Sequence, residues 1–463
     1  MIHPAALNLA GPAAKVCLPY NVSLVVAIDL SQAKSPIRSS TQQESSDLNE
    51  TETNESTQLR KLNDVLKAAK DQPFYASRLA DVSLPFHSID QLSSVPLLTK
   101  SQLLPERRGE PGRIFGLPPH QYTRMHQTSG TSGWPMPVFD TPDDWAWWLD
   151  CWQYVLDAAE VTAKDIAMMA FSFGPFIGFW TANDALVQAG AMVVPGGGMS
   201  SEARLQMIID QQCTLVCCTP TYALHLASVA ADKQIDSAQS RVSRIIVAGE
   251  PGGSVPIVRQ RIEQAWGATV IDHSGASELG AWGFGSPDGK GMHVIETQFI
   301  AELLKFDDQN PNGIPAADGE QAELVLTNLG RFGGPAIRYR TGDMVRGWRD
   351  HDYDCKFLWL EGGVLGRVDD MMVIRGVNVF PSSIEAIVRE VDAQAEFRII
   401  ATRKDEMDQL AVQVELDHDA AAKLSDLLRD RLAMRVNVQS VEHGTLQRFE
   451  AKAKRLIDRR NNT

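Results

Sequence analysis

The chain has no excess of basic residues, no long apolar run and no paired cysteine motif. Its formal net charge of −14 argues against a general nucleic-acid binder or a protein that adheres to anionic membranes. No apolar segment reaches the roughly 20 residues that a transmembrane helix needs. The six cysteines form no Cys-x-x-Cys pair, so we expect reduced thiols and a cytoplasmic protein.

The N-terminal residues 1–58 differ in composition from the rest of the chain. Residues 16–30 are apolar like the core of a signal peptide, but they contain a proline and an aspartate and precede no clear cleavage site. Residues 31–58 are rich in Ser, Thr, Gln, Asn and Glu, a composition that predicts disorder. We therefore expect residues 1–58 to be a disordered, non-secretory extension.

Strand-like and helix-like segments alternate over residues 165–275 and predict a doubly wound, mostly parallel sheet. Ligands of such sheets bind at the carboxyl ends of the strands. The strand-like runs, which are short and β-branched, are 165–173, 191–197, 214–220, 243–250 and 268–275. Residues 290–365 then predict antiparallel strands, and a smaller α+β unit follows Gly366. The expected fold class is α/β with mixed sheets, a β subdomain and a small α+β domain.

Five segments carry residue types suited to nucleotide chemistry. They are, in chain order, TSGTSGWP (128–135), AGEPGG (248–253), DHSGASELG (272–280), IRYRTGDMV (337–345) and GRVDDMMVIRGVNVFPSSIE (366–385). A loop of Ser, Thr and Gly can direct backbone N–H groups and hydroxyls at a phosphate, although such loops are also common as plain turns. The carboxylates in the later segments suit a magnesium ion and ribose hydroxyls.

In this order and spacing, the segments resemble the adenylate-forming superfamily of acyl-CoA ligases, in particular its phenylacetate–CoA ligase branch. The resemblance extends from about residue 58 to residue 463. It implies a large AMP-binding domain over residues 59–366, a small mobile domain over residues 370–463 and a hinge near Asp369. It also implies that ATP and Mg²⁺ activate a carboxylic acid as an acyl-adenylate, and that coenzyme A then accepts the acyl group.

The resemblance implies a role for each matching residue of the large domain. The β- and γ-phosphates of ATP would bind the loop of Thr128, Ser129, Gly130, Thr131, Ser132 and Gly133. The adenine would lie beside Gly249, Glu250 and Pro251, and the adenine or acyl group beside Ser274, Gly275, Ala276 and Ser277. Glu278 would bind the magnesium ion and act in catalysis, Asp343 would accept both ribose hydroxyls, and Arg367 would contact the ribose or a phosphate. The family's phosphate loop often ends in Pro-Lys, but here Pro135 precedes Met136, so no lysine role carries over to this loop.

The small domain carries three further assignments that rest on the resemblance. Lys452 best matches the catalytic lysine that bridges the carboxylate and the α-phosphate, and Lys454 is the competing assignment. Gly376 resembles the glycine past which the pantetheine of coenzyme A approaches, since it leaves room for that chain. Asp369 matches the hinge, which must change backbone conformation between the two half-reactions.

Aromatic residues after the first predicted strand suggest an acyl pocket. Phe171, Phe173 and Phe176 could line a slot for an aryl or arylacetic acid, with plain core packing as the alternative. Trp145, Trp147, Trp148 and Trp152 fall near helical spacing and are predicted to be core residues.

Three functions remain open from the sequence. The leading one is a carboxylate–CoA ligase whose partners are a small aromatic acid and coenzyme A, with neither nucleic acid nor membrane bound and a homodimer as one option. The second keeps adenylation but uses a carrier protein or a deazaflavin coenzyme as acceptor, and dependence on coenzyme A distinguishes the two. The third, a non-catalytic nucleotide-binding protein, is disfavoured because Glu278, Asp343, Arg367 and Lys452 are all retained.

If Lys452 bridges the two anions during adenylation, Lys452→Ala should slow that half-reaction by on the order of 10²- to 10³-fold, the effect of losing one preorganised charge. Thioester formation from preformed adenylate should be much less affected. Rapid-quench measurement of each half-reaction checks this, and an equal loss in both would exclude the role.

Overall fold

The computed structural model describes residues 54–128, 135–368, 372–374, 377–392, 394–404, 407–432, 434–447 and 455–460. Helix α2 (Asn54–Lys70) includes residues 54–58, which the sequence analysis assigns to the extension. Gln58 is buried, and its amide donates hydrogen bonds to the carbonyls of Glu296 at 2.7 Å and Phe299 at 2.9 Å. The predicted boundary at residue 58 is therefore wrong, since the polar residues 54–58 belong to a packed helix.

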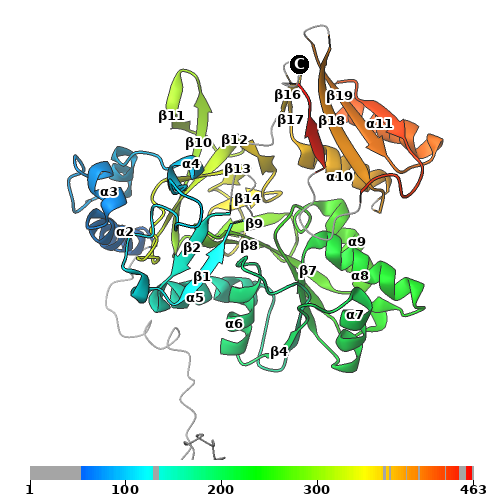
Figure 1. The fold of residues 1–463 in the computed structure, drawn as a ribbon, viewed down its shortest axis with the longest axis horizontal. Coiled ribbons are helices and arrows are strands. Elements are labelled where there is room, and N and C mark those ends of the chain that lie inside the picture. Colours follow the sequence, from blue (N-terminus) through cyan, green and yellow to red (C-terminus); the bar gives the residue numbers. More distant parts are fainter. Residues whose placement is uncertain are drawn as a thin grey trace, which may run out of the picture. The chain divides into compact units, whose positions relative to one another are not determined.

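The predicted alternation of strands and helices is confirmed (Figure 1). Parallel strands lie in the order β4-β3-β5-β6-β7, with bounds β3 (Ile166–Met169), β4 (Met192–Pro195), β5 (Leu215–Cys218), β6 (Arg244–Val247) and β7 (Thr269–Ala276). The helices between them are α6 (Trp180–Gln188), α7 (Ser201–Asp210), α8 (Pro220–Asp232) and α9 (Pro256–Trp266). Alternate strand residues face opposite sides, so Ile246 and Ile271 join the core that holds α6, whereas Ile245 and Val270 join the core that holds α7, α8 and α9.

Strand β7 joins the parallel and antiparallel parts into one sheet. Its first four residues, 269–272, pair in parallel with β6, and its last four, 273–276, pair antiparallel with β8 (Gly280–Gly285). The sheet continues through β9 (Gly291–Val294), β14 (Trp359–Glu361), β13 (Tyr339–Trp348), β12 (Gln321–Asn328), β10 (Phe299–Asp307) and β11 (Asn310–Pro315). Among the described residues, the expected β subdomain is therefore continuous with the parallel sheet.

Other elements pack around this sheet. They are α3 (Pro73–Arg78), α4 (Lys100–Leu103), the hairpin of β1 (Arg124–Gln127) and β2 (Pro137–Asp140), α5 (Pro142–Ala158) and the short β15 (Gly366–Arg367), which pairs with β13. The prediction for the four tryptophans of α5 is confirmed, since Trp145, Trp147, Trp148 and Trp152 are all buried. No helix in the described part of the chain is long and apolar enough to cross a membrane.

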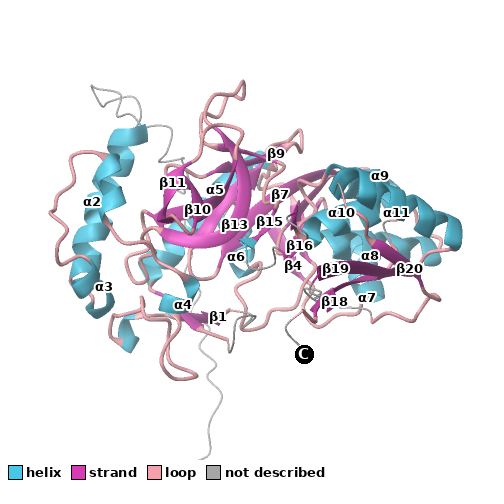
Figure 2. Cartoon of the chain, turned by 90° about the horizontal axis from the view of Figure 1, so that it is seen from above, coloured by secondary structure: helices cyan, strands magenta, loops and turns pink. Residues whose placement is uncertain are grey.

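The small domain has the predicted α+β organisation. Among its described residues, the larger sheet has the order β20-β19-β18-β21. The elements are β16 (Met372–Ile374), β17 (Val377–Val379), α10 (Pro381–Val391), β18 (Phe397–Lys404), β19 (Met407–Val414), α11 (His418–Leu432), β20 (Asn437–Ser440) and β21 (Leu456–Asp458). Figure 2 shows α10 and α11 on one face of this sheet, and Ile384 and Leu424 share a core with Ile399 and Val412.

Candidate active site

The two ends of the predicted phosphate loop are held together by hydrogen bonds. The Thr128 amide donates to the Met136 carbonyl at 3.0 Å, and the Met136 amide donates to Thr128 Oγ1 at 3.1 Å. The Gln127 amide also donates to the Pro175 carbonyl at 2.7 Å, which ties the aromatic segment to the same place. The loop residues Ser129, Gly130, Thr131, Ser132 and Gly133 lie outside the described residues, so their phosphate-binding role stays a prediction.

Glu278, the candidate magnesium ligand, lies in the turn between β7 and β8 and is only 4% exposed. The Tyr339 hydroxyl donates a hydrogen bond to its Oε1 at 2.7 Å, and the Lys100 ammonium lies 3.5 Å from the same oxygen. Burial alone would raise the pKa of Glu278, but the Lys100 charge and the Tyr339 hydroxyl hold that pKa below its ordinary value. The carboxylate is therefore kept ionised in a buried place, as a metal ligand must be.

Lys100 and Tyr339 were not predicted as site residues. Tyr339 lies within the IRYRTGD segment, so the motif offered a signal for it. Lys100 reaches the site because Leu98 bridges to β13: its amide donates to the Arg338 carbonyl at 2.8 Å, and its carbonyl accepts from the Arg340 amide at 2.8 Å. This long-range pairing has no sequence signature.

Asp343 and Arg367 face each other across β13 and β15. Arg367 Nη1 lies 2.6 Å from Asp343 Oδ1 and donates to the Thr341 carbonyl at 2.6 Å. Gly342 has a φ of +75°, and a Cβ there would come within 2.9 Å of the Arg367 guanidinium. The glycine of the RTGD motif therefore lets the guanidinium approach the backbone beside the candidate ribose-binding carboxylate.

The structure brings Asp343 and Arg367 close to the Glu278 turn through Tyr339. Burial, followed by the Glu278 charge, raises the pKa of the Tyr339 hydroxyl well above its usual range, and the charges of Asp343 and Arg367 also act on it. The hydroxyl therefore stays protonated and remains a donor to Glu278. Two motifs separated by about sixty residues thus form one cluster around a single phenol.

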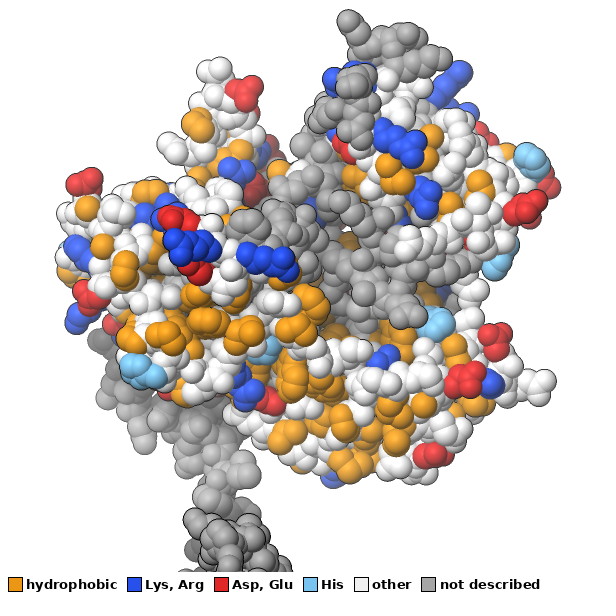
Figure 3. Space-filling model, in the orientation of Figure 1, with side chains coloured by type: hydrophobic (Ala, Val, Ile, Leu, Met, Phe, Trp, Pro, Cys, Tyr) orange, Lys and Arg blue, Asp and Glu red, His pale blue; other side chains and the backbone are white. Residues whose placement is uncertain are grey.

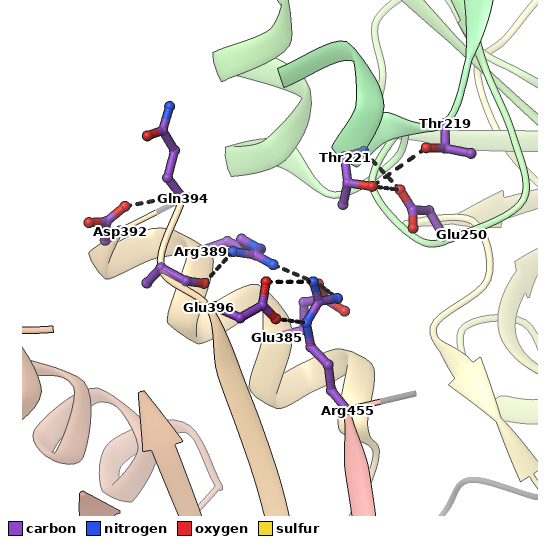
Figure 4. Close-up of polar contacts among 10 residues, drawn as sticks. Thr219, Thr221, Glu250, Glu385, Arg389, Asp392, Gln394, Glu396 and Arg455 are labelled. Atoms are coloured by element: carbon purple, nitrogen blue, oxygen red, sulfur yellow. Dashed lines mark hydrogen bonds and ion pairs between the residues drawn. The ribbon is translucent and has the colours of Figure 1, made fainter. Parts of the chain in front are cut away.

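The predicted adenine segment follows β6, and Glu250 within it already has a partner (Figure 4). Its Oε1 accepts from the Thr221 amide at 2.8 Å and from the Thr221 hydroxyl, in the first turn of α8. Gly249 has a φ of +92°, a left-handed conformation that glycine adopts without strain. The chain therefore turns at Gly249, two residues before Pro251. Ser274, Gly275 and Ala276 end β7, and the Gly275 backbone is exposed.

Arg331 fixes the position of the residue that precedes Glu278. Its guanidinium is fully buried, lies 2.7 Å from the buried Asp140 carboxylate and donates to the Ser277 carbonyl at 2.8 Å. The Glu278 turn is therefore attached to β2 through one arginine.

In the small domain, Asp369, Gly376, Lys452 and Lys454 lie outside the described residues. Arg455, the residue after Lys454, is held firmly: its Nε donates to Glu396 at 2.7 Å and its Nη1 to Glu385 at 3.2 Å (Figure 4). The chain is therefore anchored to the small domain immediately after the two candidate catalytic lysines.

Two of the three phenylalanines predicted to line the acyl pocket contact each other, while the pocket itself stays a prediction. Phe171 and Phe173 have ring centroids 4.7 Å apart, and Phe173 packs edge-on against Trp180 at 4.6 Å. Phe176 is instead 49% exposed. Figure 3 shows hydrophobic side chains gathered over α6 and β4, the elements that follow this segment in the chain. The structure thus brings two of the three phenylalanines together.

No group of three or more His, Cys, Asp or Glu side chains suited to a metal occurs within the described ranges. Glu278 would therefore bind a magnesium ion as a single protein carboxylate. A Mg²⁺ ion fits such a donor, because it is commonly held by one or two carboxylates together with phosphate oxygens and water.

Comparison with known proteins identifies the family. Residues 376–460 match the family described as AMP-binding enzyme C-terminal domain. The chain is 32% identical over 393 residues to the phenylacetate-coenzyme A ligase of Escherichia coli (strain K12), covering 81% of this chain and 87% of that protein. The chain belongs to the phenylacetate–coenzyme A ligase family of adenylate-forming enzymes.

Two further relatives extend the likeness. The phenylacetate-coenzyme A ligase of Pseudomonas putida is 29% identical over 428 residues, or 87% of this chain and 93% of that protein. The crystal structure of a 2-hydroxyisobutyryl-CoA ligase in the postadenylation state, in complex with 2-HIB-AMP, has a TM-score of 0.79 at 26% identity, covering 87% of this chain and 89% of that one. The predicted family and fold class of this ligase are confirmed, while the roles of single residues stay predictions.

Removing the Lys100 charge should move the acid limb of activity to higher pH. Lys100→Met leaves burial as the dominant effect on the Glu278 carboxyl, so its pKa rises and protonation abolishes metal binding at a higher pH than in the wild type. The pH profile of kcat/KM for ATP checks this. Lys290→Met, which removes an exposed lysine near Asp288, is the matched control and should leave the profile unchanged; an unmoved acid limb in Lys100→Met would contradict the account.

Proposed function

We propose that this chain is an acid–thiol ligase that activates a small aromatic carboxylic acid with ATP and transfers the acyl group to coenzyme A. The observation that carries the proposal is the buried Glu278 carboxylate, held ionised by Lys100 and Tyr339 beside the Asp343–Arg367 pair. Membership of the phenylacetate–coenzyme A ligase family supports the same chemistry.

The reaction joins two anions, so the residues around it have to neutralise charge. A carboxylate oxygen of the acid attacks the α-phosphorus of ATP, and the bond to pyrophosphate breaks. Lys100 and Arg367 supply positive charge on the large domain, and Lys452 is proposed to supply it between the reacting anions. This arrangement lowers the barrier by positioning and electrostatics.

Magnesium is proposed to bind Glu278. When bound, Mg²⁺ neutralises phosphate charge and orients the pyrophosphate leaving group. Glu278 accepts a hydrogen bond on Oε1 from Tyr339, and this bond fixes the orientation of the carboxylate. Asp343 is proposed to hold the ribose hydroxyls, while Arg367 keeps that carboxylate in place.

Transfer of the acyl group is proposed to use the small domain. The coenzyme A thiol attacks the acyl carbon, and AMP leaves with the oxygen that joined it to the acyl group. Gly376 is proposed to leave room for pantetheine, and Asp369 to act as the hinge between the two half-reactions.

An aromatic acid is supported by the Phe171–Phe173 pair, which lies on the segment hydrogen-bonded to Gln127 next to the phosphate loop. Ring stacking and apolar burial would favour an aryl or arylacetic acid there. The curated relatives are named for phenylacetate, which belongs to this class.

The proposal predicts that AMP and pyrophosphate form in equal amounts from ATP and Mg²⁺ with at least one aryl or arylacetic acid, and that turnover requires coenzyme A. Liquid chromatography of the nucleotides across a panel of aryl, arylacetic and fatty acids measures this, with Glu278→Gln as the control for contaminating activity. Adenylation that ignores coenzyme A would indicate a carrier protein or another acceptor. ADP as the product, or no response to any acid, would contradict the proposal.

A further inference from the structure

His273 is a buried histidine at the end of β7 that no step of the proposed mechanism uses. It is 8% exposed, and its Nδ1 lies 2.8 Å from the Gly283 carbonyl oxygen. Since a carbonyl only accepts, Nδ1 carries the proton of the ring. Burial lowers the pKa of His273 to about 4, so the ring is neutral at physiological pH and Nε2 presents a lone pair.

Nε2 of His273 borders the exposed end of β7. It has no hydrogen-bond partner among the described residues, and it lies 3.5 Å from the position that a Cβ on Gly275 would take. The Gly275 backbone is exposed, and it belongs to the SGASE segment that leads to Glu278. An unused acceptor thus lies within the predicted adenine- and acyl-binding region.

A row of aromatic rings connects His273 with the proposed acyl pocket. The His273 ring centroid is 4.3 Å from that of Trp152, which is 6.3 Å from Phe179. Phe179 lies 5.1 Å from Phe171, which lies 4.7 Å from Phe173. Residues 271 and 273 of β7 share a face, and Ile271 packs in the same core as Phe179. The imidazole therefore lies on the same side of the sheet as the apolar wall.

Although the His273 ring is buried, Nε2 faces the exposed end of β7, where a ligand can reach it. A site that offers an acceptor to a polar group of its ligand discriminates strongly against ligands that lack that group. We infer that His273 selects the acid substrate: Nε2 accepts a hydrogen bond from a neutral hydroxyl or amino group carried by the aromatic acid. The inference rests on the proposed function and narrows its substrate class from any small aromatic acid to one with a donor substituent.

The test compares kcat/KM for pyrophosphate release among three groups of aryl and arylacetic acids. The donor acids carry a hydroxyl or amino group, and the capped acids carry the same group methylated on O or N so that no donor remains. The third group has no such substituent. The wild type should favour the best acid with a donor substituent over its capped counterpart by about 10- to 100-fold, the range expected for the loss of one hydrogen bond to the site. His273→Phe should reduce that ratio to about 3-fold or less, because a ring remains but the acceptor is gone. His273→Gln, which keeps an acceptor, should restore part of the preference.

His293→Phe is the matched control. His293 lies in β9 and is also buried, burial likewise lowers its pKa, and its ring packs against Phe284 at 5.5 Å and Tyr353 at 5.3 Å. This variant should keep the wild-type ratio between donor and capped acids. Thermal unfolding of each variant confirms that the fold is retained, and His273→Gln keeps the test valid if His273→Phe does not fold.

Two results would overturn the inference: equal kcat/KM for donor and capped acids in the wild type, or an unchanged preference in both His273 variants. Pyrophosphate release with unsubstituted acids alone would leave the proposed function standing while removing the role of His273. No release with any acid would instead overturn the proposed function, and the inference with it.

Discussion

The candidate site depends on the buried ion pair between Arg331 and Asp140. Both side chains are 0% exposed, and their charged atoms lie 2.7 Å apart. Desolvating two charges costs several kcal/mol each, and removing one partner of such a pair typically destabilises a protein by about 3–5 kcal/mol. Nη1 of the guanidinium also donates to the Ser277 carbonyl, and Asp140 accepts from the Trp148 indole at 3.1 Å. One charge pair thus joins β2, α5 and the turn that presents Glu278.

A second constraint is electrostatic. The chain carries a net charge of −14, yet its candidate substrates are anions. Positive charge for these anions is supplied locally, because the Lys100 ammonium lies at the Glu278 carboxylate and the Arg367 guanidinium lies at Asp343. The Glu278 carboxylate stays ionised beside the Lys100 cation, and Arg367 pairs with Asp343, so the site can accept a divalent cation and a polyphosphate without a basic surface elsewhere.

Much of the fold could be predicted from the sequence, because the alternation over residues 165–275 is a local pattern with clear periodicity. Asp343 and Arg367 could be proposed as site residues because they lie in segments with specific motifs, and the register of β13 and β15 places them opposite each other. Lys100 could not be predicted, since it reaches Glu278 only through the pairing of Leu98 with β13.

The boundary at residue 58 was wrong because Gln58 is polar yet buried by hydrogen bonds to carbonyls more than 200 residues away. The continuity of the sheet was also missed, because nothing in the composition of β7 shows that its two halves pair in opposite senses.

The proposed chemistry requires a carboxylate oxygen of the acid to attack the α-phosphate of ATP in this site. Tracing ¹⁸O from an acid labelled at both carboxyl oxygens tests this attack, because the oxygen that joins the acyl group to the phosphate leaves with the nucleotide. Mass spectrometry should find one ¹⁸O atom in each AMP formed during thioester synthesis. Label in inorganic phosphate, or unlabelled AMP, would contradict the account.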